Sequence, residues 1–254
     1  IPEMMDKRRW LTRKMEDHFQ LYGYKQVDIP IYDFFQLYEL KSGEKVINDI
    51  FTFLDPPKHR AEENPPVYAL RPEFTASLVR AYITSELMYR PKPQKYFYIG
   101  PCFRYDEPSP GRYRQFTQAG LEVFGADSVS ADAEMMIVAM DFLKKVGFTD
   151  YLLRINDLMI IRTYLNEKKL NIETQGKIIG IIDNITSHIR KTEIGAEDEL
   201  SVDDWIMEYR NQMTELTIAS EIIQDLEGLL ELVGNPQEIL QQLKMTFDSY
   251  PKTQ

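Results

Sequence analysis

The stretch Tyr96–Gly125, YFYIGPCFRYDEPSPGRYRQFTQAGLEVFG, contains two candidate strands and a loop between them. The runs Tyr96–Tyr105 and Gln115–Phe124 are rich in aromatic and apolar residues, which is typical of strands. The segment Glu107–Gly111 contains two prolines and a glycine, and proline cannot donate a ladder hydrogen bond. The sequence therefore predicts two antiparallel strands joined by a long loop, a form that is unusual unless something binds beneath it.

Polar side chains interrupt both strands at positions otherwise suited to burial. They are Arg104, Asp106, Arg112, Arg114, Gln118 and Glu122. Side chains alternate across a strand, so Gln118 and Glu122 point to the same face. One interpretation is a hairpin with a solvated polar face, and the other is the wall of a binding site. Between Arg90 and Gln118, six Lys or Arg residues against two acidic ones favour a small anionic ligand such as a nucleotide.

The composition limits the class of protein. The 254 residues are 43% hydrophobic and 28% charged, as in an ordinary soluble globular protein. No long apolar run predicts a membrane span, and the first residues, IPEMMDKRRW, do not form a signal peptide. With the single cysteine Cys102 and three dispersed histidines, we expect no internal disulfide, no zinc site and a cytosolic, cytoplasmic location. The net charge of −10 argues against a general affinity for nucleic acid.

Periodicity predicts a mixed order of helices and strands up to residue 157. A helix over residues 3–22 has one apolar face, on which His18 is expected to be a packed core histidine; the face consists of Trp10, Leu11, Met15, His18, Phe19 and Tyr22. Strands are predicted at Tyr24–Ile29, Ile50–Leu54, Val67–Leu70 and Tyr151–Ile155, and helices at Asp33–Leu40, Ala76–Tyr89 and Ala131–Val146. The last of these helices turns inward Met135, Met136, Val138, Ala139, Phe142 and Leu143.

Two smaller features of this part of the chain bear on function. The segment Asp55–Pro66 is a polar loop in which His59 is expected to be solvated. The strand Val67–Leu70 is followed by Arg71 and Glu73, which form either a surface ion pair or ligands at the end of a sheet.

From about Leu158 onward only helical periodicity remains. Helices are predicted at 158–167, 174–190, 202–231 and 236–249. Asn156-Asp157 starts the first, Ser201 with Asp204 forms a capping box, and Gly234-Asn235-Pro236 separates the last two. The acidic run Glu193, Glu197, Asp198 and Glu199 is interpreted as solvated loop. We therefore predict an α+β part at 1–157 and an all-helical part at 158–254.

Two segments resemble the histidyl-tRNA synthetases, a family of class II aminoacyl-tRNA synthetases. LRPEFT, Leu70–Thr75, resembles the family's histidine-binding segment, and Phe103–Gly125 resembles its motif 2. The helix at 3–22 with Tyr24–Pro30 is similar to motif 1, a dimer-interface element. The resemblance implies an antiparallel class II sheet flanked by helices, followed by an all-helical insertion domain. Within the family, the residue types at Phe74 and Asp106 suggest a resemblance to the archaeal-like subgroup.

The resemblance also implies roles for eight side chains. Arg104 would be catalytic and bind the ATP α-phosphate and the amino-acid carboxylate, offsetting charge as the carboxylate attacks phosphorus. For the rest of ATP it implies Asp106 at the adenine amino group, Arg112 at the γ-phosphate and Phe116 stacked on adenine. For histidine it implies Glu73, Thr75 and Gln118 at the α-ammonium group and Glu122 at the imidazole. Buried acceptors of this kind reject analogues that cannot satisfy them.

The implied reaction joins histidine and ATP into histidyl-adenylate, with Mg²⁺, and then transfers histidine to tRNA(His) in a homodimer. The chain contains no RGLDYY-like segment, no motif 3 and no anticodon-binding domain. It is therefore expected to be an N-terminal fragment that does not form adenylate at a normal rate by itself.

Two other functions remain open from sequence. The first is a synthetase-like regulatory subunit of histidine biosynthesis, which binds histidine without charging tRNA. Arg104, Arg112 and Phe116 favour the enzyme, because a histidine sensor does not need a complete ATP site. The second is the synthetase-like domain of a stress kinase, which tends to lose these ligands.

Overall fold

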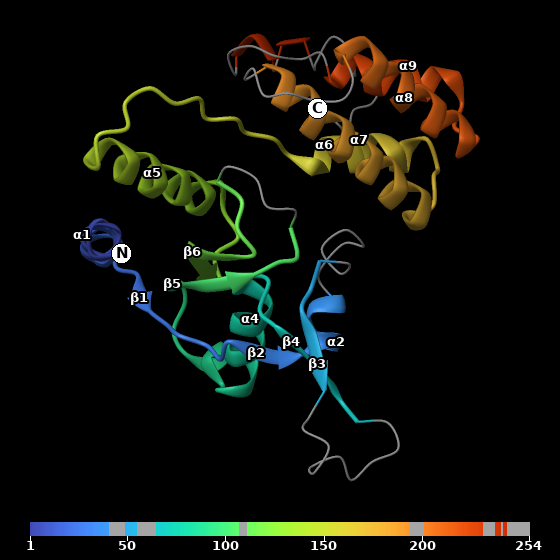
Figure 1. Ribbon diagram of the computed structural model, residues 1–254. Coiled ribbons are helices and arrows are strands. Elements are labelled where there is room, and N and C mark those ends of the chain that lie inside the picture. The colour runs from blue at the N-terminus through green and yellow to red at the C-terminus, as the bar shows by residue number, and fades with distance from the viewer. Residues whose placement is uncertain are drawn as a thin grey trace. The chain divides into compact units, whose positions relative to one another are not determined.

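The chain divides into two compact units, Ile1–Tyr151 and Leu152–Gln254. The computed structural model describes residues 1–40, 49–54, 65–106, 111–193, 201–230, 237–239 and 241–242 (Figure 1). His59, residues 107–110 of the predicted hairpin loop, the acidic residues after Glu193 and the predicted break at Gly234–Pro236 lie outside them.

The centre of the first unit is the predicted hairpin. Strand β5 (Gln94–Phe103) pairs antiparallel with β6 (Gln115–Phe124), from Gln94 opposite Phe124 to Phe103 opposite Gln115. The two predicted strands and their pairing are therefore confirmed.

A third strand joins this sheet in a direction that was not predicted. Strand β1 (Lys25–Gln26) runs parallel to β5, so the sheet is mixed and not purely antiparallel. The strand predicted at Tyr24–Ile29 is also shorter. Its final residues bond to side chains: the Ile29 amide donates to Asp28 Oδ1 at 2.9 Å, and the Ile29 carbonyl accepts from Arg71 Nη1 at 2.6 Å. Backbone groups bound in this way do not continue a ladder.

Two long helices cover one face of the sheet. Helix α1 (Pro2–Leu21) and helix α5 (Val129–Lys145) share a buried cluster with the strands, formed by Phe19, Tyr24, Phe97 and Val138. His18 is buried with Nε2 2.9 Å from the Val138 carbonyl, as expected of a core histidine.

The predicted faces of these two helices are partly wrong. Trp10 is 51% exposed, and Ala139 also lies on the exposed side of its helix. Only the last two turns of α1 bury residues, and no buried cluster of the described residues includes a side chain from its first half.

Helix α4 (Thr75–Thr84) packs on the opposite face. Its cluster contains Ile29, Phe74, Leu78, Tyr82, Tyr96, Tyr98 and Cys102. The helix predicted to reach Tyr89 ends at Thr84, because Glu86 adopts a left-handed backbone (φ 57°) before the short helix η2 (Leu87–Tyr89).

A second small sheet has the order β2-β4-β3. Strands β2 (Tyr32–Phe34) and β3 (Thr52–Leu54) both pair antiparallel with β4 (Val67–Leu70). The helix predicted at Asp33–Leu40 is therefore wrong at its start: helix α2 covers Phe35–Glu39. Asp33 pairs opposite Ala69, and Arg80 Nη1 donates to its buried carboxylate at 2.6 Å. Strand pairing and this ion pair override local helical preference.

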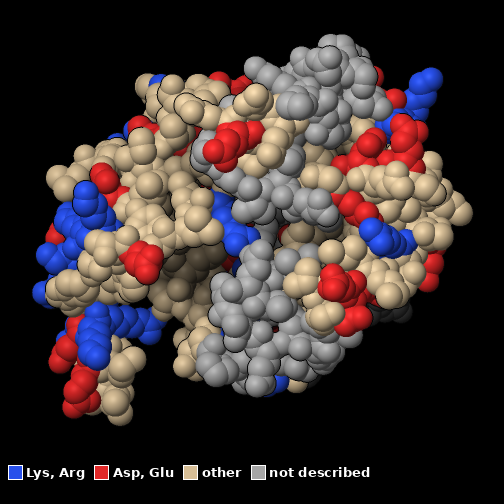
Figure 2. All heavy atoms as spheres, turned by 90° about the horizontal axis from the view of Figure 1, so that it is seen from above, with Lys and Arg blue, Asp and Glu red and all other residues tan. Residues whose placement is uncertain are grey.

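Charged side chains of both signs lie on the face of the molecule seen from above (Figure 2). On the face shown in Figure 2, Lys and Arg are interspersed with Asp and Glu. Among the described residues, no helix is both long and apolar enough to cross a bilayer.

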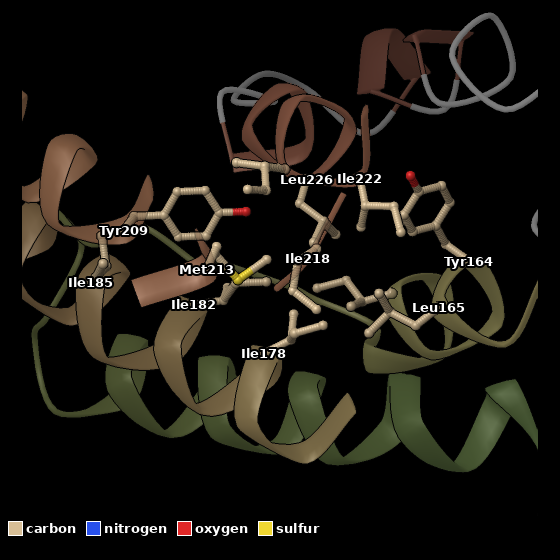
Figure 3. Close-up of a cluster of buried hydrophobic side chains, with 12 residues drawn as sticks. Tyr164, Leu165, Ile178, Ile182, Ile185, Tyr209, Met213, Ile218, Ile222 and Leu226 are labelled. Atoms are coloured by element: carbon tan, nitrogen blue, oxygen red, sulfur yellow. The ribbon is translucent and has the colours of Figure 1, made fainter. Parts of the chain in front are cut away.

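The second unit is built from four helices in its described residues. They are α6 (Leu158–Glu167), α7 (Ile172–Glu193), α8 (Val202–Glu215) and α9 (Ser220–Leu230). Their core includes Ile178, Tyr209, Met213 and Leu226, all at most 1% exposed (Figure 3). Residues 237–239 and 241–242, inside the helix predicted at 236–249, are also helical.

Two helix starts in this unit were predicted correctly, with their capping residues. Asp157 caps α6 by accepting from the Met159 amide, and the capping box of Ser201 and Asp204 is present. The single helix predicted at 202–231 is two helices, because Thr217 adopts a left-handed backbone (φ 57°).

The strand predicted at Tyr151–Ile155 is not formed. Leu152 and Ile155 are 76% and 65% exposed, and none of the described strands pairs with this segment. A strand needs a neighbouring backbone for its hydrogen bonds, and its apolar composition alone does not supply one.

Candidate active site

The candidate site lies on one face of the β5–β6 hairpin. In β6, Phe116, Gln118, Gly120 and Glu122 alternate with residues of the opposite face. Their partners across the ladder in β5 are Cys102, Gly100, Tyr98 and Tyr96. This register confirms the prediction from sequence that Gln118 and Glu122 share a face.

Two glycines leave room for aromatic rings on that face. A Cβ atom on Gly120 would lie 2.3 Å from the Tyr98 hydroxyl, and one on Gly100 would lie 2.7 Å from the Phe74 ring. Tyr98 and Phe74 stack at 4.2 Å between centroids with their planes 5° apart. The stacked pair thus fixes the position of the segment that begins α4 relative to the hairpin.

Acidic and hydroxyl groups meet beside this pair. Thr75 Oγ1 donates to Glu122 Oε1 at 2.7 Å. Glu73 Oε1 accepts from the Ala76 amide at 3.2 Å, which places its carboxylate at the N-terminus of α4. The charges of Glu122 and Glu73 both act on the Tyr98 hydroxyl, so both carboxylates lie near it. Three of the four predicted histidine ligands are therefore gathered around Tyr98.

The fourth predicted ligand, Gln118, is held from the opposite strand. The Cys102 thiol donates to Gln118 Oε1 at 3.3 Å. Cys102 is fully buried, and burial raises the pKa of its thiol to about 11, against the lowering effect of Arg71 and Arg104. The thiol therefore remains protonated at neutral pH, as a donor must.

The basic end of the site contains Arg104 and Phe116. The Arg104 guanidinium lies 5.3 Å from the centroid of the Phe116 ring, and its Nε donates to the Pro72 carbonyl at 3.0 Å. The Arg104 amide bonds to the Arg114 carbonyl across the hairpin at 3.0 Å. Two predicted ATP ligands thus meet, next to the segment that carries Glu73.

The remaining two predicted ATP ligands lie at the two ends of the hairpin loop. Asp106 is half-buried and Arg112 is exposed. No hydrogen bond or ion pair between described residues joins either of them to Arg104 or Phe116.

Arg71 corrects one of the sequence alternatives. It is 1% exposed, so it does not form a surface ion pair with Glu73. Its Nε donates to the Pro101 carbonyl at 2.7 Å, and its Nη1 donates to the Ile29 carbonyl at 2.6 Å. Arg71 therefore joins three chain segments behind the site.

Sequence reasoning also missed Tyr98 and Cys102. A signal was present, since both occupy alternate β5 positions on the face that the hairpin register gives to Gln118 and Glu122. Burial raises the pKa of Tyr98 to about 12, and the charges of Glu122 and Glu73 add to this, while a hydrogen bond with Thr75 lowers it.

The family model of the histidyl-tRNA synthetases matches residues 1–253. The chain belongs to this family. Archaeal histidine–tRNA ligases are similar to it: that of Pyrococcus abyssi is 32% identical over 249 residues, covering 98% of this chain and 52% of the relative. That of Methanocaldococcus jannaschii is 33% identical over 246 residues, covering 95% of this chain and 56% of the relative. The chain thus spans about half the length of these curated synthetases.

A solved histidyl-tRNA synthetase, from Nostoc sp. PCC 7120, shares the fold. It has a TM-score of 0.71 and 19% identity over 98% of this chain and 51% of its own. At that identity the similarity supports the mixed α+β fold and carries no residue roles.

Proposed function

We propose that this chain provides the part of a class II histidyl-tRNA synthetase that binds histidine and ATP. One observation carries the proposal: the hairpin face brings Glu122 and Thr75 into contact at one end and Arg104 and Phe116 at the other. Thr75 and Glu122 are 47 residues apart in sequence, and a hairpin whose polar face is only solvated would not require this contact.

Histidine is recognised by acceptors at two ends of the molecule. Glu73, Thr75 and Gln118 hold the α-ammonium group, and Glu122 accepts from the imidazole. A carboxylate at each end selects a zwitterion whose side chain carries an N–H donor. Analogues that cannot satisfy these acceptors are rejected because the carboxylates would be left unpaired.

ATP is bound at the basic end. Arg104 contacts the α-phosphate and the histidine carboxylate, and offsets the charge that builds up as the carboxylate attacks phosphorus. Phe116 stacks on adenine, Asp106 accepts from the adenine amino group, and Arg112 holds the γ-phosphate. Arg104 already lies over the Phe116 ring, a geometry that supports a site for a stacked base beside a phosphate.

Mg²⁺ enters this site with ATP. In the part of the chain that the structure describes, no three His, Cys, Asp or Glu side chains are placed so that they could hold a metal ion together. Phosphate oxygens and water are therefore the main ligands proposed for the ion. Such an ion would supply neutralisation of the phosphate charge, and Arg104 would position the α-phosphate.

The complete reaction forms histidyl-adenylate and transfers histidine to tRNA(His), in a cytoplasmic homodimer. We assign residues 1–157 to the catalytic core and 158–254 to the helical insertion domain, which the helices α6–α9 support. The alternative, a regulatory subunit of histidine biosynthesis, is not better supported. The fold is shared with a solved protein named as regulatory subunit or synthetase, but at 18% identity.

Calorimetric titration with histidine and with ATP tests the assignment. Glu122→Gln is expected to weaken histidine binding by more than about tenfold, because a neutral amide replaces a charged acceptor. Arg104→Ala is expected to weaken ATP binding by a similar factor, about tenfold or more.

ATP binding by Glu122→Gln is the control for its effect on histidine. Glu122→Gln is expected to bind ATP within about twofold of the unaltered chain, since the carboxylate lies at the other end of the hairpin face. If Glu122→Gln binds histidine as well as the unaltered chain does, the role proposed for Glu122 is wrong.

A further inference from the structure

The Glu122 carboxylate is held by a residue from another segment of the chain. Thr75 Oγ1, at the start of helix α4, donates to Glu122 Oε1 on strand β6 at 2.7 Å. Within the part of the chain that the structure describes, no second side-chain hydrogen bond reaches this carboxylate. Its other oxygen, Oε2, therefore keeps its lone pairs for a ligand.

Thr75 is the rigid partner of this hydrogen bond. The residue before it, Phe74, stacks on Tyr98 at 4.2 Å between ring centroids, and the amide of the residue after it, Ala76, donates to Glu73 Oε1 at 3.2 Å. Thr75 is also β-branched, which restricts rotation about its first side-chain torsion. The glutamate that it binds has a longer side chain with more rotamers to lose. The hydroxyl group therefore orients the carboxylate, and the reverse does not hold.

We propose that Thr75 is a positioning residue for Glu122, whose carboxylate it fixes so that Oε2 accepts from the imidazole of histidine. This rests on the function proposed above, which gives Thr75 only a contact with the α-ammonium group. The two roles use different parts of the hydroxyl group, because its proton goes to Glu122 and its lone pairs remain for the ammonium group. Thr75 thus links the recognition of the two ends of histidine.

The arrangement has a consequence for affinity. Without the Thr75 hydroxyl, the Glu122 side chain regains rotamers that histidine binding must then remove, so the imidazole is bound more weakly. Two substitutions separate the hydroxyl group from the shape of the side chain. Thr75→Val keeps the branched shape and removes the hydroxyl group, whereas Thr75→Ser keeps the hydroxyl group and removes the methyl group.

A double-mutant cycle on this chain tests the proposal. Histidine dissociation constants are measured by nuclear magnetic resonance titration, which reaches weak millimolar binding, for the unaltered chain, Thr75→Val, Glu122→Gln and the double variant. Thr75→Val is expected to weaken histidine binding about tenfold. In the Glu122→Gln background the same change is expected to weaken it about threefold or less, because a hydrogen bond to a neutral acceptor is about half as strong as one to a carboxylate.

Thr75→Ser and Thr84→Val complete the test. Thr75→Ser is expected to bind histidine within about threefold of the unaltered chain, because the hydroxyl group that it keeps still donates to Glu122. Thr84→Val is the matched control at the other end of α4, where the Thr84 hydroxyl donates to the Arg80 carbonyl at 3.0 Å and is exposed. It is expected to stay within about twofold.

Four results would overturn the role of Thr75. They are equal losses from Thr75→Val in both Glu122 backgrounds, no loss at all, a loss from Thr75→Ser as large as that from Thr75→Val, and the same loss from Thr84→Val. If the unaltered chain does not bind histidine, the proposed function itself is wrong.

Discussion

The Arg71 guanidinium holds together the residues that present the candidate site. Besides its bonds to the carbonyls of Pro101 and Ile29, it lies 3.8 Å from the centroid of the Phe74 ring. A guanidinium can do this because its donors diverge from a rigid plane and the same plane stacks on an aromatic ring. The Asp28 carboxylate, 3.7 Å from Nη1, is 90% exposed and contributes little.

Arg71→Lys is expected to lower the free energy of unfolding of the first unit by about 1–3 kcal/mol, since one ammonium group cannot reach both carbonyls and a lost buried bond costs about that much. Urea unfolding followed by Trp10 fluorescence in a Trp205→Phe background measures this. The matched control is Arg90→Lys at an exposed position of the same unit, expected to change stability by less than about 0.5 kcal/mol. A change as small for Arg71→Lys would show that the carbonyls do not depend on the guanidinium.

Arg71 also shows why some residues of the site could not be predicted. The alternation of Gln118 and Glu122 is a local property of one strand, so their shared face was predicted correctly. The partners of Arg71 are 30 and 42 residues away in sequence, and a surface or ligand role for it was equally consistent with LRPEFT. Contacts between distant segments depend on register and packing, which a single sequence does not specify.

At the scale of helices and strands, predictions were reliable where a structure depends on contacts between residues that are close in sequence. The starts of α6 and α8 depend on Asp157 and Ser201, whose side chains bond to amides two and three residues ahead. Strands depend on a second segment, so Asp33 was predicted helical and lies in β2, while Tyr151–Ile155 was predicted as a strand and is not one. These errors fall where tertiary pairing decides the structure.

The capping box of α8 yields a stability prediction. Ser201 Oγ accepts from the Asp204 amide at 3.2 Å and donates to Asp204 Oδ2 at 2.6 Å. Ser201→Ala is expected to cost about 1 kcal/mol of unfolding free energy in the second unit at neutral pH. Urea unfolding followed by Trp205 fluorescence, with Trp10→Phe to remove the other signal, measures it.

The same cap predicts a dependence on pH. The hydrogen bonds from Ser201 lower the pKa of Asp204 from its ordinary value of 3.8. A carboxyl whose pKa is lower in the folded state contributes stability above the unfolded pKa, and this is lost as pH falls through the folded pKa. The cost of Ser201→Ala is thus expected to shrink in acid. Asp204→Ala removes the capping carboxylate, and Asp203→Ala, in the same turn, is the control for charge alone. If both variants change the pH dependence of the unfolding free energy equally, the cap is not the cause of that dependence.

At the scale of the whole molecule, the candidate site and the core of the four helices belong to different units. All eight predicted site residues lie in Ile1–Tyr151, while the core of Ile178, Tyr209, Met213 and Leu226 belongs to Leu152–Gln254. Each unit buries its own apolar side chains, which is the condition for a part of a chain to fold around its own core.

Leu226→Ala is therefore expected to lower the stability of the second unit by about 2–5 kcal/mol, because this fully buried side chain would leave a cavity between α8 and α9. Trp205 fluorescence during urea unfolding reports the loss. Met207→Ala, 58% exposed on α8, is the control and is expected to change stability by less than about 0.5 kcal/mol. Histidine binding by Leu226→Ala, measured well below its unfolding midpoint, is expected to equal that of the unaltered chain. A weakened histidine affinity in a still-folded Leu226→Ala chain would show that the helical unit contributes to the site on the hairpin.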